Sequence, residues 1–133
     1  EALLTALGEQ VHVLRDPTRG GLATTLNEIA AQSKVSIEID EQAVPIHPAV
    51  ASACEFLGLD PLYIANEGKL IVIVEEDVAQ EALSIIRSCK YGENAAVIGR
   101  VSSEQPGFVS MKTAIGGKRL VEWLNSDPLP RIC

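Results

Sequence analysis

The spacing of apolar residues predicts helices and strands that alternate along most of the chain. Apolar positions recur at helical intervals in four segments, which we expect at 1–7, from residue 22, at 47–57 and at 78–91. Strands are expected where apolar residues alternate or run together, at 11–15, 35–39, 70–74, 95–101, 108–111 and 119–121. This order predicts an α+β fold in which helices pack on a mixed β-sheet.

Single residues predict where some of these elements begin and end. Gly8 and Gly58 should end the first and third helices, and Asp77 should cap the fourth. The strand at 70–74 is rich in β-branched residues and does not alternate. Such a run is typical of a central strand that is covered on both faces.

The helix from residue 22 should pack by one face. Its apolar residues include Leu22, Leu26 and Ile29, so Thr25 and Asn27 are expected on the opposite, polar side.

Composition narrows the classes of partner. The 133 residues suit one compact domain, which we place at 1–122, and a proline-containing extended tail at 123–133. A net charge of −7 argues against nucleic acid as a partner. No apolar run approaches the ~20 residues of a membrane span, and no leader precedes the first strand. We therefore expect no membrane partner and a cytoplasmic location.

A glycine-rich turn between the first strand and the second helix is the strongest candidate site in the sequence. It reads Asp16-Pro17-Thr18-Arg19-Gly20-Gly21-Leu22. Glycines let the backbone approach an anion closely, and the following helix would offer unpaired N–H groups and the positive end of its dipole. Thr18 could add a hydroxyl and Arg19 a guanidinium. The alternative is a strand-to-helix turn whose glycines serve backbone geometry alone.

Three widely spaced cysteines predict neither a disulfide framework nor a metal site. Cys54 and Cys89 fall on the apolar faces of expected helices, where free cysteine behaves as a small hydrophobic residue. Cys133 differs, because it ends a tail that no core requires, and we expect its thiol to be exposed and reactive.

Three stretches together resemble a known family. They are Arg15-Asp16-Pro17-Thr18-Arg19-Gly20-Gly21-Leu22-Ala23, Asn66-Glu67-Gly68 before an apolar strand, and the ending Pro130-Arg131-Ile132-Cys133. The chain resembles the C-terminal part of the hydrogenase maturation family HypE, within the aminoimidazole ribonucleotide synthetase-like (PurM-like) group of ATP-using enzymes. The glycine turn indicates only the larger group, whereas the ending indicates HypE. The resemblance implies a fold like the PurM C-terminal domain.

The resemblance also implies a reaction at Cys133. In the family the terminal cysteine receives a carbamoyl group from the carbamoyltransferase HypF, and an ATP-dependent dehydration converts the S-carboxamide into a thiocyanate. The thiocyanate supplies the cyanide ligand of the nickel-iron hydrogenase centre, with the HypC–HypD complex as the iron-carrying partner. Glu67 lies in a loop next to an apolar strand, where a carboxylate has no evident structural role, so we expect it to be the base and Asn66 to orient the substrate. The alternative is that Glu67 is a plain turn residue.

Further expectations follow from the resemblance. The residues of the turn expected to bind phosphate or substrate are Asp16, Thr18, Arg19, Gly20 and Gly21. ATP and Mg²⁺ should be held mainly by an N-terminal domain that this chain lacks, and the intact protein should be a homodimer. The chain alone is therefore expected to be inactive, and no metal ligands are expected within it.

Two other functions remain open from the sequence. The chain could belong to another ATP-using enzyme of the same group, one that acts on a soluble substrate. It could also be a non-catalytic docking module that presents its C-terminal peptide to partners, since protein surfaces can capture a C-terminal carboxylate.

Overall fold

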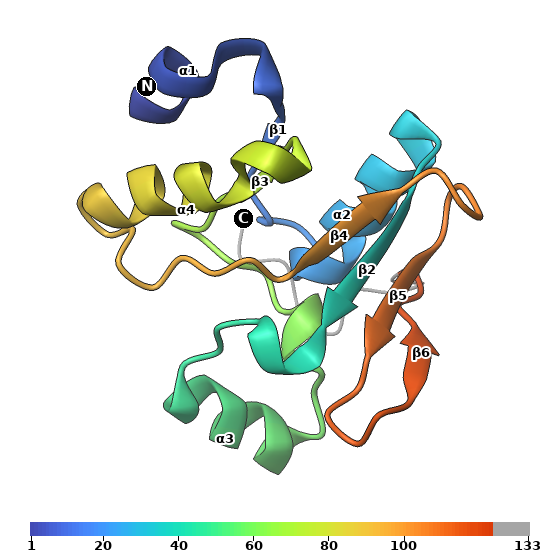
Figure 1. Cartoon of the computed structure of the whole chain (residues 1–133). Helices are drawn as coiled ribbons and strands as arrows, with labels where there is room; N and C mark the ends of the chain where they lie inside the picture. The colour runs from blue at the N-terminus through green and yellow to red at the C-terminus, as the bar shows by residue number, and fades with distance from the viewer. Residues whose placement is uncertain (124–133) are drawn as a thin grey trace. The chain divides into compact units, whose positions relative to one another are not determined.

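The computed structural model describes residues 1–123, which form two compact units (Figure 1). The first unit comprises Glu1–Arg15 and Leu70–Val97, and the second comprises Asp16–Lys69 and the described residues from Ile98 onwards. The chain thus enters the second unit, returns to the first and then re-enters the second. All but the first residue of the predicted tail lies outside the described residues.

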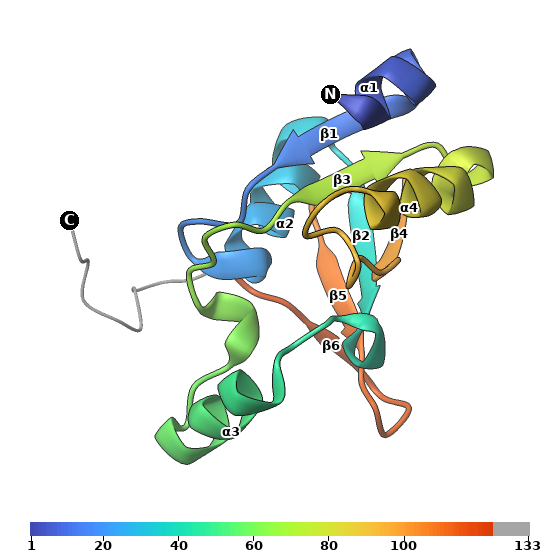
Figure 2. The same cartoon turned by 90° about the vertical axis from the view of Figure 1, so that its left-hand side faces the viewer.

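The first unit is a two-stranded sheet with two helices. Its elements are α1 (Ala2–Leu7), β1 (Val11–Arg15), β3 (Ile71–Val74) and α4 (Ala79–Ser88). β1 and β3 are antiparallel, with Val13 opposite Ile73, and they lie side by side in Figure 2. Leu3 and Leu7 of α1 pack with Val78 and Ala82 in a buried cluster. Burying these side chains stabilises the unit because it removes apolar surface from water.

The prediction of a central strand at 70–74 was wrong. In the described part of the chain, β3 pairs only with β1, and three of its four residues are half-buried. Val72 and Val74 pack against the buried cluster of the first unit. The run lacks alternation because both faces are partly covered, although the sheet is only two strands wide.

Two predictions about α4 were also wrong. A 3₁₀ turn at Glu76–Val78 precedes the helix, so its N-cap is Val78, which makes no side-chain capping bond, and Asp77 is not the cap. The helix ends at Ser88, and Cys89 is exposed, with its Sγ donating to the Ile85 carbonyl at 3.3 Å. Because the helix ends three residues before the predicted end at residue 91, Cys89 adopts an extended backbone as the C-cap and does not enter the core.

The second unit contains a four-stranded mixed sheet, as predicted for the fold class. Its strands are β2 (Ser36–Asp40), β4 (Gly99–Ser102), β5 (Val109–Lys112) and β6 (Lys118–Leu120). The order is β4-β2-β5-β6, in which β2 and β5 are parallel and the other pairs are antiparallel.

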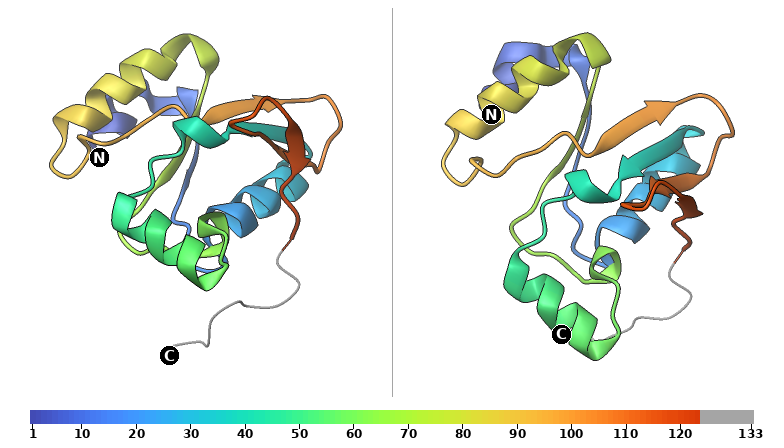
Figure 3. Two further views of the ribbon diagram at one scale, coloured as in Figure 1. Left: turned by 90° about the horizontal axis from the view of Figure 1, so that it is seen from below. Right: turned by 60° about the horizontal axis from the view of Figure 1, so that its bottom comes forward.

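One long helix, α2 (Gly21–Ser33), packs on this sheet (Figure 3). Ile37 and Ile39 alternate along β2, and Val109 and Met111 alternate along β5; all four side chains are buried. Their period of two places them on one face of the sheet, where they form the core of the second unit.

A second helix, α3 (Pro48–Leu57), begins and ends as predicted. His47 is its N-cap and accepts a hydrogen bond from the Ala49 N–H through Nδ1, and Pro48 occupies the first turn. Gly58 ends the helix with a left-handed φ of 67°. Cys54 is 6% exposed, which confirms it as a core residue. A single 3₁₀ turn, η3 (Pro61–Tyr63), follows.

Within residues 1–123, no helix combines the length and the apolar character needed to cross a bilayer.

Candidate functional site

The glycine turn leads into α2 through two residues with left-handed backbones. Gly20 is the N-cap of α2, with φ 64°, and Gly21 follows with φ 63°. The Gly20 carbonyl accepts the first helical bond, from the Thr24 N–H at 3.2 Å. Glycine adopts these angles at little steric cost, whereas other residues are strained there.

Close packing provides a second reason for each glycine. A Cβ at Gly20 would collide with the side chain of Thr24, and a Cβ at Gly21 would lie 2.5 Å from the carbonyl oxygens of both Leu62 and Ile64. Both positions are therefore filled by the protein itself. The two glycines are therefore required by the backbone conformation and by close packing. An anion bound here would be held by backbone N–H groups and neighbouring side chains.

The structure brings the Asn66 loop to the glycine turn. The Asn66 N–H donates to the Pro17 carbonyl at 3.1 Å, and this bond lies within the second unit. Asn66 is half-buried and Glu67 is exposed, and Gly68 has a left-handed φ of 71°. Two segments about fifty residues apart in sequence, both chosen as candidate sites, therefore meet in space.

The side chains around this junction combine a cation with hydrogen-bonding groups. Asp16 and Arg19 are exposed, and Thr18 is half-buried. An exposed guanidinium beside a helix N-terminus suits a phosphate or carboxylate. The Glu67 carboxylate is accessible to a ligand from solvent. Within residues 1–123, no group of three or more His, Cys, Asp or Glu side chains could hold a metal ion. The exposed guanidinium and the hydrogen-bonding groups at this junction suit an anion.

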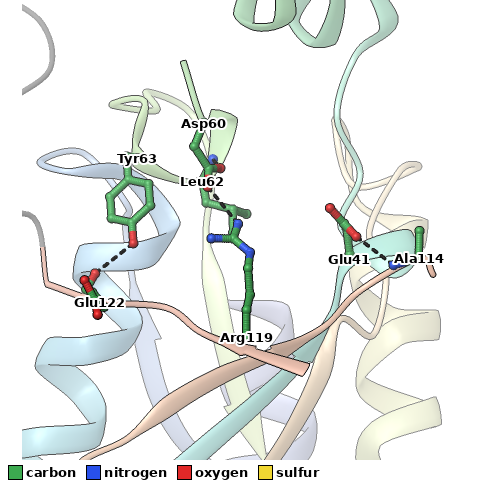
Figure 4. A network of polar contacts seen from close by, with 7 residues as sticks. All are labelled: Glu41, Asp60, Leu62, Tyr63, Ala114, Arg119 and Glu122. Atoms are coloured by element: carbon green, nitrogen blue, oxygen red, sulfur yellow. Dashed lines mark hydrogen bonds and ion pairs between the residues drawn. The ribbon is translucent and has the colours of Figure 1, made fainter. Parts of the chain in front are cut away.

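Residues that the sequence reading missed fasten the end of the sheet to the turn at η3 (Figure 4). The Tyr63 hydroxyl donates to the Glu122 carbonyl at 2.9 Å. Arg119 Nη2 lies 2.7 Å from Asp60 Oδ2, and Asp60 Oδ1 accepts from the Leu62 N–H. No local pattern predicts the Tyr63–Glu122 and Arg119–Asp60 contacts, because the partners are 59 residues apart.

The expectation that Thr25 and Asn27 lie on a polar outer face was wrong. Each is only 3% exposed. Thr25 Oγ1 donates to the Gly21 carbonyl at 3.0 Å, and Asn27 Nδ2 donates to the carbonyls of Ala23 and Val121, both at 2.9 Å. These bonds satisfy polar groups that would otherwise be costly to bury. Asn27 thereby joins α2 to the segment after β6.

Ionisation of Tyr63 should lower the free energy of unfolding as the pH rises in the alkaline range. Burial, followed by the nearby Asp60 carboxylate, raises the pKa of Tyr63 above its ordinary value, although Arg119 acts in the opposite direction. A raised folded pKa means that the contribution to stability is complete below the unfolded pKa of about 10 and is lost as pH rises through the folded pKa.

We therefore expect wild type to lose more unfolding free energy than Tyr63→Phe as the pH rises from about 9 to 11. Urea denaturation of both proteins across this range measures the difference. All other residues are identical in the two proteins, so the comparison isolates Tyr63. Identical pH dependence in the two proteins would contradict the prediction.

The chain matches the family described as AIR synthase related protein, C-terminal domain, over residues 1–112. It is 52% identical over 131 residues to carbamoyl dehydratase HypE of Rhizobium leguminosarum bv. viciae, covering 98% of this chain and 37% of that protein. The chain therefore spans less than two fifths of the length of this relative.

Solved structures agree with this match. A crystal structure of hydrogenase maturation protein HypE in complex with ATP superposes with a TM-score of 0.84 at 54% identity, covering 90% of this chain and 37% of that one. A crystal structure of a HypE–HypF complex superposes with a TM-score of 0.87 at 47% identity, covering 93% and 40%. The chain thus belongs to the family of AIR synthase related protein C-terminal domains, and it is similar to the corresponding part of HypE.

Proposed function

We propose that this chain is the C-terminal part of an ATP-dependent dehydratase that converts an S-carboxamide on Cys133 into a thiocyanate for nickel-iron hydrogenase maturation. The observation that carries the proposal is the 52% identity to a carbamoyl dehydratase HypE across nearly the whole chain. The terminal cysteine gives the reaction an acceptor atom, although Cys133 lies outside the described residues.

The reaction has a balanced form. The Cys133 thiolate first attacks an activated carbamoyl donor held by the carbamoyltransferase; the C–S bond forms as the donor's leaving group departs, and the product is R–S–C(=O)–NH₂. This carboxamide and ATP then give R–S–C≡N, ADP and inorganic phosphate, so the amide oxygen leaves with the phosphate and two N–H protons are released to bases. ATP supplies the phosphoryl group that makes the oxygen a good leaving group. The residues of this chain must therefore position the carboxamide and accept a proton from its nitrogen.

The junction of the glycine turn and the Asn66 loop supports these roles. We assign Glu67 as the base and Asn66 as the group that orients the carboxamide. The bond from the Asn66 N–H to the Pro17 carbonyl holds this loop at the turn. Thr18 and Arg19 would contact phosphate or substrate, together with Asp16 and the backbone of Gly20 and Gly21.

Partners and cofactors belong to the same proposal. The similarity to HypE structures described with ATP and with HypF supports ATP as a substrate and a HypF-type carbamoyltransferase as a partner. We further propose that Mg²⁺ is bound with ATP mainly by an N-terminal domain outside this chain. The proposal also includes a homodimeric intact protein, a HypC–HypD acceptor, and a cytoplasmic location.

Glu67→Gln in the full-length protein tests the assignment of the base. This variant keeps the size of the side chain and removes its basicity, so we expect dehydration to slow by about 10²–10⁴-fold with carbamoylation unchanged. Conversion of the carboxamide to thiocyanate is followed by mass spectrometry. Glu104→Gln is the matched control, because Glu104 is another exposed glutamate of the second unit. A normal rate of dehydration in Glu67→Gln would refute the role.

A further inference from the structure

Three side-chain contacts, two of them drawn in Figure 4, fasten the last described residues of the chain within the second unit. Arg119 is paired with Asp60, the Val121 carbonyl accepts from Asn27, and the Glu122 carbonyl accepts from Tyr63. Val121 is also 2% exposed, and its N–H donates to the Val109 carbonyl at 2.9 Å. The chain is therefore held at consecutive residues after β6, immediately before Trp123.

The three contacts differ in what they do. The Asn27 amide is buried and bonds two carbonyls, so its removal would leave unsatisfied groups in the core. The Arg119–Asp60 pair is partly exposed, and such pairs contribute little to stability. The Tyr63 hydroxyl acts at Glu122, beyond the buried Val121. Removing this hydroxyl can therefore release the Glu122 carbonyl while Val121 stays buried in the core.

Tyr63 also borders the candidate site. The carbonyl carbon of Tyr63 lies 2.9 Å from the position a Cβ on Gly21 would occupy, and the carbonyls of Leu62 and Ile64 lie 2.5 Å from it. The residue that holds Glu122 is thus in backbone contact with the glycine turn, within the same unit. The point from which the C-terminal segment departs is fixed beside the candidate site.

We infer that Tyr63 is a positioning residue for the reaction at Cys133, because its hydroxyl holds the Glu122 carbonyl, the point from which the C-terminal segment starts. The inference rests on the proposed function. Eleven residues follow Glu122, so Cys133 can lie at most about 36–40 Å from that anchor. With a tether of limited reach, a fixed origin raises the effective concentration of the thiol derivative at a site beside the anchor.

Loss of the hydrogen bond between Tyr63 and Glu122 should slow dehydration and leave carbamoylation unchanged. Carbamoylation takes place in a separate partner, which meets the tip of the segment and does not require the anchor. Dehydration takes place on this protein and requires the carboxamide to reach a defined geometry, where small misplacements are costly. A purely structural role would instead lower stability and slow both steps together.

The test uses the full-length protein carrying Tyr63→Phe, a HypF-type carbamoyltransferase, carbamoyl phosphate and ATP. We expect carbamoylation within about twofold of wild type, and single-turnover dehydration at saturating ATP slowed on the order of three- to tenfold. The KM for ATP should not change. Tyr91→Phe is the matched control: it removes the same hydroxyl from an exposed tyrosine of the first unit, and it should behave as wild type.

The other outcomes separate the inference from the proposed function. Normal dehydration in Tyr63→Phe, or equal slowing of both steps with a lower melting temperature, would overturn the inference alone. Failure of wild-type Cys133 to gain a carbamoyl group would overturn the proposed function, and the inference with it.

Discussion

Cys133→Ala in the full-length protein should abolish both carbamoylation and thiocyanate formation while leaving stability almost unchanged. The substitution removes the only atom that the proposed reaction modifies. Thiolate is the reactive form, and an unperturbed thiol with a pKa of about 8.5 is only slightly ionised at neutral pH, so we expect the partner to assist deprotonation. Mass spectrometry of the C-terminal peptide measures the modification directly.

Cys54→Ser and Cys89→Ser are the matched controls, and their expected costs in stability differ because Cys54 is buried and Cys89 is exposed. Cys54 is buried in the second unit, so a hydroxyl there should cost about 1–3 kcal/mol of unfolding free energy. Cys89 is exposed, so its replacement should cost within about 0.5 kcal/mol. Both variants should retain the chemistry. A carbamoyl or cyano adduct on Cys133→Ala protein would contradict the assignment.

Gly21→Ala should destabilise the second unit by about 2–5 kcal/mol, the sum of left-handed strain and overpacking. The added Cβ would meet the carbonyl oxygens of Leu62 and Ile64 at 2.5 Å, and these are backbone atoms that cannot rotate away. Chemical denaturation measures the loss.

Gly58→Ala is the control for backbone strain. Gly58 has a similar φ of 67°, but a Cβ there would meet nothing within 4 Å. Its replacement should cost about 1–2 kcal/mol, the strain alone. Equal losses in the two variants would show that close packing at Gly21 adds nothing to the strain.

Local signals predicted most of the elements because the physics that forms them is local. Gly58 ends α3 since glycine adopts the left-handed conformation, and the alternation at Ile37 and Ile39 gives β2 its buried face. The neighbours of a strand are not local. The run at β3 therefore suggested a central strand, whereas it pairs with β1 alone in the described part of the chain.

In the candidate site, too, local patterns predicted some residues, and others depend on partners that are remote in sequence. The glycine turn and the Asn66 loop were chosen from the sequence, and a backbone hydrogen bond joins them. Tyr63 was missed because its partner, Glu122, is remote in sequence. Asn27 was misplaced because helical periodicity puts it on a polar face, and only the tertiary contact shows why a buried amide is satisfied there.

Mass spectrometry of the C-terminal peptide of the full-length protein tests the central claim most directly. The protein is incubated with a HypF-type carbamoyltransferase and carbamoyl phosphate, and ATP for the second step is added afterwards. The proposed function predicts that Cys133 first gains the mass of one carbamoyl group and then, only with ATP, loses the mass of one water. A Cys133 that stays unmodified, or a carboxamide that persists with ATP present, would contradict it.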